Sequence, residues 1–239
     1  MKNRLLYLLN IFIINILISL NAYSVEQFNF DITEVEILED GNIFKGTKKG
    51  IIKTNDGITI IADTFIYDKI SNILNARGNV EIEDSSRNLK IYSQKAVYNK
   101  NKEILVTEIN SKAVYEDGKF IFADTFKFDR FQNTIYANNN AKAYDTIRDY
   151  VISADDIIYY KNSEKIITKG NTEAFIKSRY EINSKDVTYL HNEQILSSEN
   201  KSKIKDNESQ VYFAEKFNYY INEDIIKGEE VLIITNYNL

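Results

Sequence analysis

The 239-residue sequence contains no cysteine, no proline and no tryptophan, and its single histidine is His191. The lack of cysteine excludes a disulfide framework, thiolate metal sites and cysteine nucleophiles. One histidine rules out a multi-histidine metal centre and disfavours histidine-based triads. Average usage of about 5% would give about a dozen prolines, so proline-rich linkers and polyproline ligands are excluded as well. These absences disfavour an enzyme, and we expect neither a cofactor nor a metal site.

What remains is rich in apolar residues: 44% of the chain is hydrophobic, with 17 Tyr and 13 Phe. This is enough for a packed core and too much for a disordered tail. No linker or shift in composition divides the chain after residue 24. We therefore expect one elongated domain over residues 25–239.

The N-terminus has the pattern of a secretory signal peptide over residues 1–24. Lys2 and Arg4 precede an uncharged apolar stretch, and Ala22 and Ser24 form a small-x-small end. The alternative is an uncleaved membrane anchor. Either way the rest of the chain lies outside the cytoplasm. Cleavage leaves 28 basic against 35 acidic residues, a formal charge of −7, which argues against nucleic acid as a partner.

The most informative feature is an internal repeat of about 30 residues. The segment ADTFIYD at 62–68 returns as ADTFKFD at 123–129 and, more loosely, at 93–99, 154–160, 184–190 and 214–220. The steps between first residues are 31, 30, 31, 30 and 30. Such regularity predicts six copies of one structural unit, near 58–82, 89–113, 119–143, 150–174, 180–204 and 210–232.

When the six copies are aligned, three positions, which we call columns, keep one type of residue in every copy. Each copy has an aromatic residue, a polar residue five positions later and an aliphatic residue two positions beyond that. The aromatic column is Tyr67, Tyr98, Phe128, Tyr159, Tyr189 and Tyr219. The polar column is Asn72, Glu103, Asn133, Glu164, Gln194 and Asp224, and the aliphatic column is Leu74, Leu105, Ile135, Ile166, Leu196 and Ile226.

Alternating apolar and polar residues within each unit predict strands with one buried face. Ile60 and Ala62 share a face, and so do Phe65 and Tyr67, but the two pairs are out of phase by one residue. This predicts a bend near Asp63, with a similar break at Gly78. Turn signals at both strand ends favour an antiparallel meander. In the irregular stretch 25–57, we expect Ile43 and Ile51 to take the places of Leu74 and Ile82.

The sequence resembles the OstA/LptA-like family of lipopolysaccharide transport proteins. The resemblance rests on the signal peptide, the 30-residue period, the A-D-x-F-x-Y-D motif and the Gly-Asn pairs at 78–79 and 170–171, and it covers residues 28–239. It implies an all-β fold, an elongated antiparallel β-jellyroll forming an open-ended gutter, located in the periplasm and associated with the outer membrane. It also implies that lipid A acyl chains lie inside and sugars outside.

The apolar inner face is the predicted lipid-binding groove. Its residues, one or more from most of the repeats, are Ile60, Phe65, Tyr67, Leu74, Ile91, Tyr98, Leu105, Ile121, Phe126, Phe128, Ile135, Ile152, Tyr159, Ile166 and Tyr189. The expected partners are lipopolysaccharide and other OstA-like domains, joined through unpaired edge strands. The N-terminal edge, around Phe28 to Leu38, is expected to meet a bridge protein.

Within the family, six repeats favour the N-terminal periplasmic domain of an LptD-type assembly protein, with a C-terminal outer-membrane barrel outside this chain. The alternative member is a stand-alone LptA-like bridge. Two rivals from other classes are an adhesin, in which the apolar ladder is only core, and a right-handed β-helix enzyme acting on polysaccharide. For the enzyme, the carboxylates would be Asp63, Asp124, Asp155 and Glu215, although we expect these acids to cap turns at the bends. His191 is expected to be a solvated loop residue.

Overall fold

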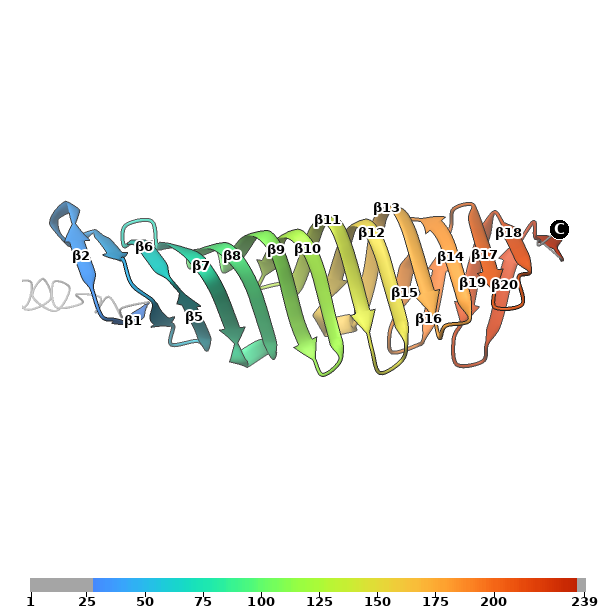
Figure 1. The fold of residues 1–239 in the computed structure, drawn as a ribbon, viewed down its shortest axis with the longest axis horizontal. Helices are drawn as coiled ribbons and strands as arrows, with labels where there is room; N and C mark the ends of the chain where they lie inside the picture. Colours follow the sequence, from blue (N-terminus) through green and yellow to red (C-terminus); the bar gives the residue numbers. More distant parts are fainter. Residues whose placement is uncertain (1–27, 236–239) are drawn as a thin grey trace, which may run out of the picture.

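The computed structural model describes residues 28–235, so the predicted signal segment lies outside the described residues. These residues form an elongated all-β structure in which every strand pairing is antiparallel (Figure 1). Strands stack side by side along the long axis from β1 (Asn29–Ile32) at one end to β21 (Leu232–Ile234) at the other. The predicted meander is confirmed. A right-handed β-helix is excluded, because its strands would be parallel.

Seven long strands form the middle of the molecule. They are β7 (Ile73–Asp84), β8 (Leu89–Asn99), β9 (Ile104–Glu116), β10 (Lys119–Asp129), β11 (Thr134–Asp145), β12 (Tyr150–Tyr160) and β13 (Lys165–Ile176). Each bends at its centre, where the pairing register shifts, as between Arg77 and Val80 of β7 or Phe122 and Thr125 of β10. The bend predicted near Asp63 is also present, because β5 (Ile58–Ala62) ends before it and β6 (Thr64–Asp68) begins after it.

The bends divide the sheet into two half-sheets. Half-sheet A consists of the strand segments that lie on the same side of the bends as β5. Half-sheet B consists of the segments that lie on the same side as β6. Half-sheet A begins with β1 and β4 (Gly50–Lys53) and ends with β14 (Tyr180–Lys185), β17 (Ser202–Asp206), β18 (Val211–Ala214) and β21. Half-sheet B begins with β2 (Val35–Leu38) and β3 (Ile43–Gly46) and ends with β15 (Thr188–Leu190), β16 (Ile195–Ser198), β19 (Lys216–Tyr220) and β20 (Ile225–Glu229).

The two half-sheets face each other across one core. Tyr115 of half-sheet A lies 4.5 Å from Tyr159 of half-sheet B, measured between ring centroids. Tyr150 lies 5.1 Å from Tyr189 in the same way. Inward residues of both half-sheets belong to a single hydrophobic cluster. The strands join the half-sheets along one long side, and the hairpin turns of the two half-sheets meet along the other, which we call the mouth.

The turns of half-sheet B share a left-handed residue. Asn72 has φ +54° and Glu103 has φ +52°, and the same region is adopted by every other member of the polar column. Asparagine tolerates this conformation better than most L-residues. The repeated polar column thus marks the position at which each hairpin of half-sheet B turns back.

The register of the first unit differs from the prediction by one residue. Phe44, not Ile43, pairs with Tyr67, which in turn pairs with Leu74. Ile52, not Ile51, pairs with Ile60 and is fully buried. The spacing from Phe44 to Leu74 is therefore 30 residues, and a shift of one residue exchanges the two faces of a strand.

Candidate functional site

The interior is lined by residues that recur once or twice in every repeat. All fifteen residues of the predicted groove point inward, and none of their side chains is more than 6% exposed. Their outward neighbours differ sharply, since Ile66 is 46% exposed and Lys127 is also exposed. The sequence pattern thus separates the inner face from the outer face. The inner face is a continuous apolar track along the molecule.

Four of the five tyrosines in the aromatic column form hydrogen bonds with the polar column through their hydroxyls. Tyr67 donates to Asn72 Oδ1 at 2.8 Å, Tyr98 to Glu103 Oε2 at 3.0 Å, and Tyr219 to Asp224 Oδ1 at 3.0 Å. In the Tyr189 repeat, Gln194 Nε2 donates to the hydroxyl at 2.9 Å. The spacing of five residues therefore places the hydroxyl of a buried ring within hydrogen-bond distance of the turn that follows it.

The third repeat breaks this pattern. It has Phe128 where the others have tyrosine, and Asn133 Oδ1 is buried without a hydrogen-bond partner among the described residues. Asn133 Nδ2 still donates to Asn162 Oδ1 at 2.6 Å. One acceptor is thus unsatisfied at the point where the hydroxyl is missing.

The acids at the bends act as local hydrogen-bond acceptors. Asp63 Oδ2 accepts from Asn79 Nδ2, and Asp124 Oδ2 accepts from Asn140 Nδ2, both at 2.8 Å. Asp155 Oδ2 accepts from the backbone N–H of Asn171 at 3.1 Å. The partners are 16 residues apart in all three cases. Glu215, in the last repeat, instead pairs with Lys201 at 2.9 Å.

The interior opens into an apolar hollow at the C-terminal end. It has a volume of about 280 Å³ and lies between half-sheet A and β20. Its lining consists of Tyr180, Ile204, Tyr212, Ala214, Ile226, Gly228, Val231 and Ile233. The predicted groove stopped at Tyr189 and so missed these residues. Ile226 belongs to the aliphatic column, and Tyr212 occupies the repeat position of Ile182, so the period could have identified both.

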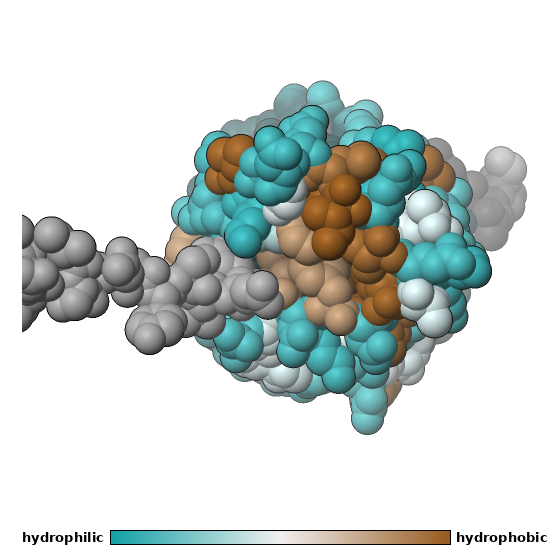
Figure 2. All heavy atoms as spheres, turned by 90° about the vertical axis from the view of Figure 1, so that its left-hand side faces the viewer, coloured by the Kyte–Doolittle hydropathy of each residue, from teal (hydrophilic) through white to brown (hydrophobic). Residues whose placement is uncertain are grey.

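Both ends of the molecule present unpaired strand edges. At the N-terminal end β1 pairs with β4 and β2 pairs with β3, and each has one edge without a partner strand among the described residues. Ile37 of β2 is 60% exposed. Figure 2 shows hydrophobic surface over the middle of this end, within a mostly hydrophilic rim. At the C-terminal end β20 and β21 are the edges, and Leu232 is 59% exposed.

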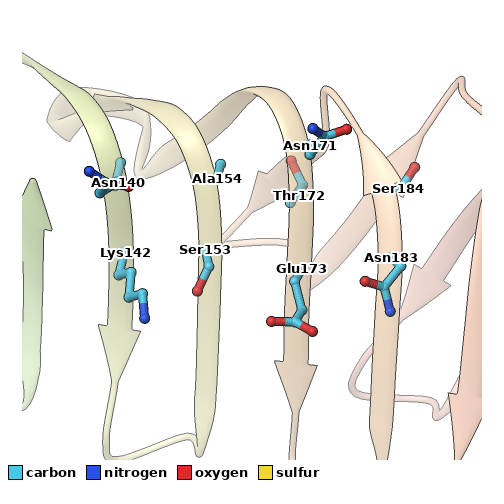
Figure 3. Close-up of a pocket in the computed structure, with 10 residues that line it drawn as sticks. Asn140, Lys142, Ser153, Ala154, Asn171, Thr172, Glu173, Asn183 and Ser184 are labelled. Carbon is cyan, nitrogen blue, oxygen red and sulfur yellow. The ribbon is translucent and has the colours of Figure 1, made fainter.

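The outer surface has a hollow of different character along the bends. It has a volume of about 490 Å³, and polar side chains from four neighbouring strands, β11 to β14, line it (Figure 3). Lys142, Ser153, Glu173 and Asn183 form a row across these strands. This surface is separate from the apolar interior, and it contains none of the predicted groove residues.

His191 is not the solvated loop residue that the sequence suggested. Its side chain is 11% exposed, and Nδ1 lies 3.0 Å from the hydroxyl of Tyr150. Nε2 lies 3.2 Å from Lys119 Nζ. Both neighbours belong to half-sheet A, whereas His191 belongs to half-sheet B. The prediction was wrong because it treated the turn as isolated, although the turn packs against the opposite half-sheet at the mouth.

Two further searches of residues 28–235 concern metals and membranes. No group of three or more histidine, aspartate or glutamate side chains in this range is arranged to hold a metal ion. No helix in the same range has the length and hydrophobicity needed to cross a bilayer.

Comparison with known proteins gives a likeness to solved structures only. No protein-family profile matches the sequence, and no curated protein matches it. Among solved structures, the chain is similar to LptH from Pseudomonas aeruginosa, the LptA-homologous periplasmic component of its lipopolysaccharide transport device. The identity is 15% and the TM-score 0.43, over 48% of this chain and 83% of LptH.

Proposed function

We propose that this protein carries lipopolysaccharide through the periplasm, with the acyl chains held between the two half-sheets. The observation that supports this proposal is the apolar track, which runs the length of a narrow molecule and opens into an apolar hollow at one end. A repeat protein lengthens without enlarging its cross-section. Such an interior suits a long hydrocarbon ligand better than a compact one.

The proposed partners at the two ends are other domains of the same architecture. Within residues 28–235, each half-sheet has one free edge at each end, and both ends expose apolar side chains beside those edges. An incoming strand would gain backbone hydrogen bonds and cover apolar surface at once. Addition of β1 and β2 to the C-terminal edges of another domain would continue both half-sheets and the track between them.

Within this function, we propose that the chain is the periplasmic N-terminal part of an LptD-type assembly protein. The six repeats support this assignment over a stand-alone bridge protein, which is the second candidate. The reading frame of the gene beyond Leu239 distinguishes the two. A long series of amphipathic membrane strands would establish the first candidate, and an immediate stop codon would establish the second.

We further infer that the protein is not an enzyme. The acids at the bends, which the polysaccharide-enzyme hypothesis requires, are engaged by asparagines or by lysine. Substitution of Asp63 or Asp124 by asparagine would alter bend stability without abolishing any function of the interior.

Site-specific photo-crosslinking tests the carrier proposal. A photoreactive amino acid at Phe65 or Phe126 faces the interior, whereas at Ile66 or Lys127 it faces solvent from the neighbouring strand position. With purified lipopolysaccharide, we expect adducts from the two inner positions and few from the outer pair. Adducts from the outer pair alone would contradict the proposal. Near-UV circular dichroism of each variant checks that the inner substitutions preserve the fold.

A further inference from the structure

Two clusters of polar side chains at the mouth are copies of each other. Adding 61 to the residue numbers of the first cluster gives the second. Six positions carry the same residue type in both clusters, namely Asp56, Asp84, Arg87, Tyr98, Lys100 and Glu103 in the first. The seventh position differs, since Arg130 returns as His191. We call Arg130 and the six residues around it the arginine latch, and His191 and the six residues around it the histidine latch. The second latch consists of Asp117, Asp145, Arg148, Tyr159, Lys161, Glu164 and His191.

The arginine latch joins the half-sheets through a buried guanidinium. Arg130 is 1% exposed and lies in a turn of half-sheet B. It donates from Nε to Asp84 Oδ2 at 2.7 Å and from a terminal nitrogen to Asp56 Oδ2 at 2.6 Å, both in half-sheet A. It also pairs with Glu103 in its own half-sheet. Three carboxylates thus satisfy one cation across the mouth.

The surrounding charges hold this network in its ionised form. Burial opposes ionisation of Asp56, but hydrogen bonds from Arg130 and Lys100 outweigh it and hold the pKa of the carboxyl well below its usual range. Arg87 adds a further link, because its Nε donates to the backbone carbonyl of Arg130 at 3.1 Å. The half-sheets are therefore joined here by several charge-assisted hydrogen bonds, which are stronger than neutral ones.

The histidine latch is incomplete. The imidazole contacts Glu164 at 3.3 Å, Lys119 and Arg148, but it makes no hydrogen bond to Asp145. Asp145 Oδ2 is buried and has no hydrogen-bond partner among the described residues. The nearest cation is Arg148 at 3.9 Å, which belongs to the same turn as Asp145 and reaches across the mouth only to the imidazole of His191, not to a carboxylate. The position of Arg130 is here occupied by His191, whose shorter side chain makes no hydrogen bond to Asp145 from across the mouth.

We propose that the mouth opens at the histidine latch while the arginine latch keeps the half-sheets joined, so that acyl chains enter or leave the interior sideways next to His191. This inference rests on the proposed carrier function for the identity of the ligand. Opening at this point would bring water to Asp145 Oδ2, the oxygen of this carboxylate that has no hydrogen-bond partner among the described residues, whereas Oδ1 keeps its bonds from the backbone N–H groups of Ile147 and Arg148. The same opening at the arginine latch would break buried ion pairs. The ligand class is a lipid with an apolar tail and a polar head that stays at the mouth.

Matched pairs of spin labels test the opening directly, because the chain has no native cysteine. Ser85 and Gln132 lie in exposed turns on the two sides of the arginine latch. Thr146 and Glu193 are their equivalents 61 residues later. The hydroxyls of Ser85 and Thr146 make the same 3.1 Å hydrogen bond, to the carbonyls of Gly57 and Gly118. Cysteine substitution at these positions therefore perturbs both latches equally.

Double electron–electron resonance on the ligand-free protein should give a broad or two-peaked distance distribution for the 146/193 pair and a narrow one for the 85/132 pair. Addition of purified lipid A should change only the 146/193 distances. The variant His191→Arg should narrow that distribution and slow lipid loading at least several-fold. Narrow, unchanged distributions at both latches would overturn the proposal.

The two proposals fail in different ways. If lipid A does not crosslink to inner positions but the ligand-free 146/193 distribution is broad, the carrier function is wrong and the opening stands. If crosslinking succeeds while the 146/193 pair stays narrow, the lipid enters elsewhere, for example through the ends. The variant Arg130→His should loosen the 85/132 pair, and if it fails to fold, His191→Arg still decides the question.

Discussion

At the scale of single residues, four of the repeats place a tyrosine hydroxyl against a polar turn residue, and the departure at Phe128 is informative. Its partner Asn133 keeps the same left-handed backbone, with φ +50°, although the hydroxyl is missing. The turn geometry therefore does not depend on the hydrogen bond. The hydrogen bond adds stability to a turn that the strands on either side already define.

We predict that Phe128→Tyr stabilises the protein. The new hydroxyl would reach Asn133 Oδ1, as Tyr67 reaches Asn72, and a satisfied buried acceptor is worth about 1 kcal/mol. Urea denaturation should show a higher midpoint with an unchanged slope. Phe126→Tyr is the matched control, because Phe126 is equally buried but lies outside the aromatic column, and its hydroxyl should destabilise the protein. A lower midpoint for Phe128→Tyr would contradict the prediction.

We predict that His191 makes stability fall in mild acid. Burial lowers the pKa of His191, and the neighbouring Lys119 and Arg148 lower it further. The unfolded chain thus binds the proton more tightly than the folded one. The stability contributed by the neutral ring is complete above the unfolded pKa of about 6.5 and is lost as the pH falls through the window below it.

The measurement is the free energy of unfolding from urea titrations between about pH 7.5 and pH 5. His191→Gln cannot titrate, so its stability should fall less steeply than that of the wild-type protein over this range. Carboxylates contribute equally to both proteins. Parallel curves would show that the ring is not held in its neutral form.

At the scale of strands and turns, the bends show how a short phase slip in the sequence becomes a structural feature. The slip between Ala62 and Phe65 predicted the bend at Asp63, and the break at Gly78 was found in the same way. The pattern is local, so the sequence alone reveals it. The mouth is different, because its partners, such as Asp84 and Arg130, are 46 residues apart and belong to different repeats.

The latches escaped sequence analysis for a second reason. The two latches are 61 residues apart, which is two repeats, whereas the visible motif recurs every 30 or 31 residues, so a comparison of neighbouring repeats does not reveal them. His191 in particular gave no sign of its neighbours, since its contacts come from Tyr150 and Lys119 in the other half-sheet. The inner face was predictable because alternation along a strand directly reports which side is buried.

We predict that Gly170→Ala weakens the bend of β13. Gly170 has φ +77°, and an added Cβ would lie 1.9 Å from Asp155 Oδ2, the group that accepts the Asn171 hydrogen bond. We expect a loss of at least about 1 kcal/mol from backbone strain plus displacement of Asp155. Gly41→Ala is the control, since Gly41 has φ +92° but nothing within 4 Å of the new atom. Equal losses in thermal unfolding would show that the contact with Asp155 is unimportant.

At the scale of the whole molecule, the two ends differ from the middle because their strands have free edges. Each interior strand pairs on both sides, and β2 and β20 pair on one side among the described residues. An exposed edge with apolar side chains favours addition of another strand. The protein is therefore suited to end-to-end assembly along its own axis.

We predict that Ile37→Lys weakens such assembly. Ile37 lies on the N-terminal edge strand and is 60% exposed, and lysine on an edge strand opposes further pairing. Loss of one buried isoleucine corresponds to about 1.5 kcal/mol or more, which is about tenfold in affinity. Sedimentation velocity over a concentration series measures the change. Ile70→Lys is the control, because Ile70 is 74% exposed in a side turn and should leave association unaltered.

The 61-residue displacement between the two latches also corresponds to a fixed length along the axis of the molecule. Each 30-residue unit adds two strands to each half-sheet, and neighbouring strands are about 4.8 Å apart, so a pair of units extends the axis by about 19 Å. Duplication or loss of one such pair would preserve the strand register, the inner track and the alternation of latches. The length of the molecule would then change in steps of fixed size.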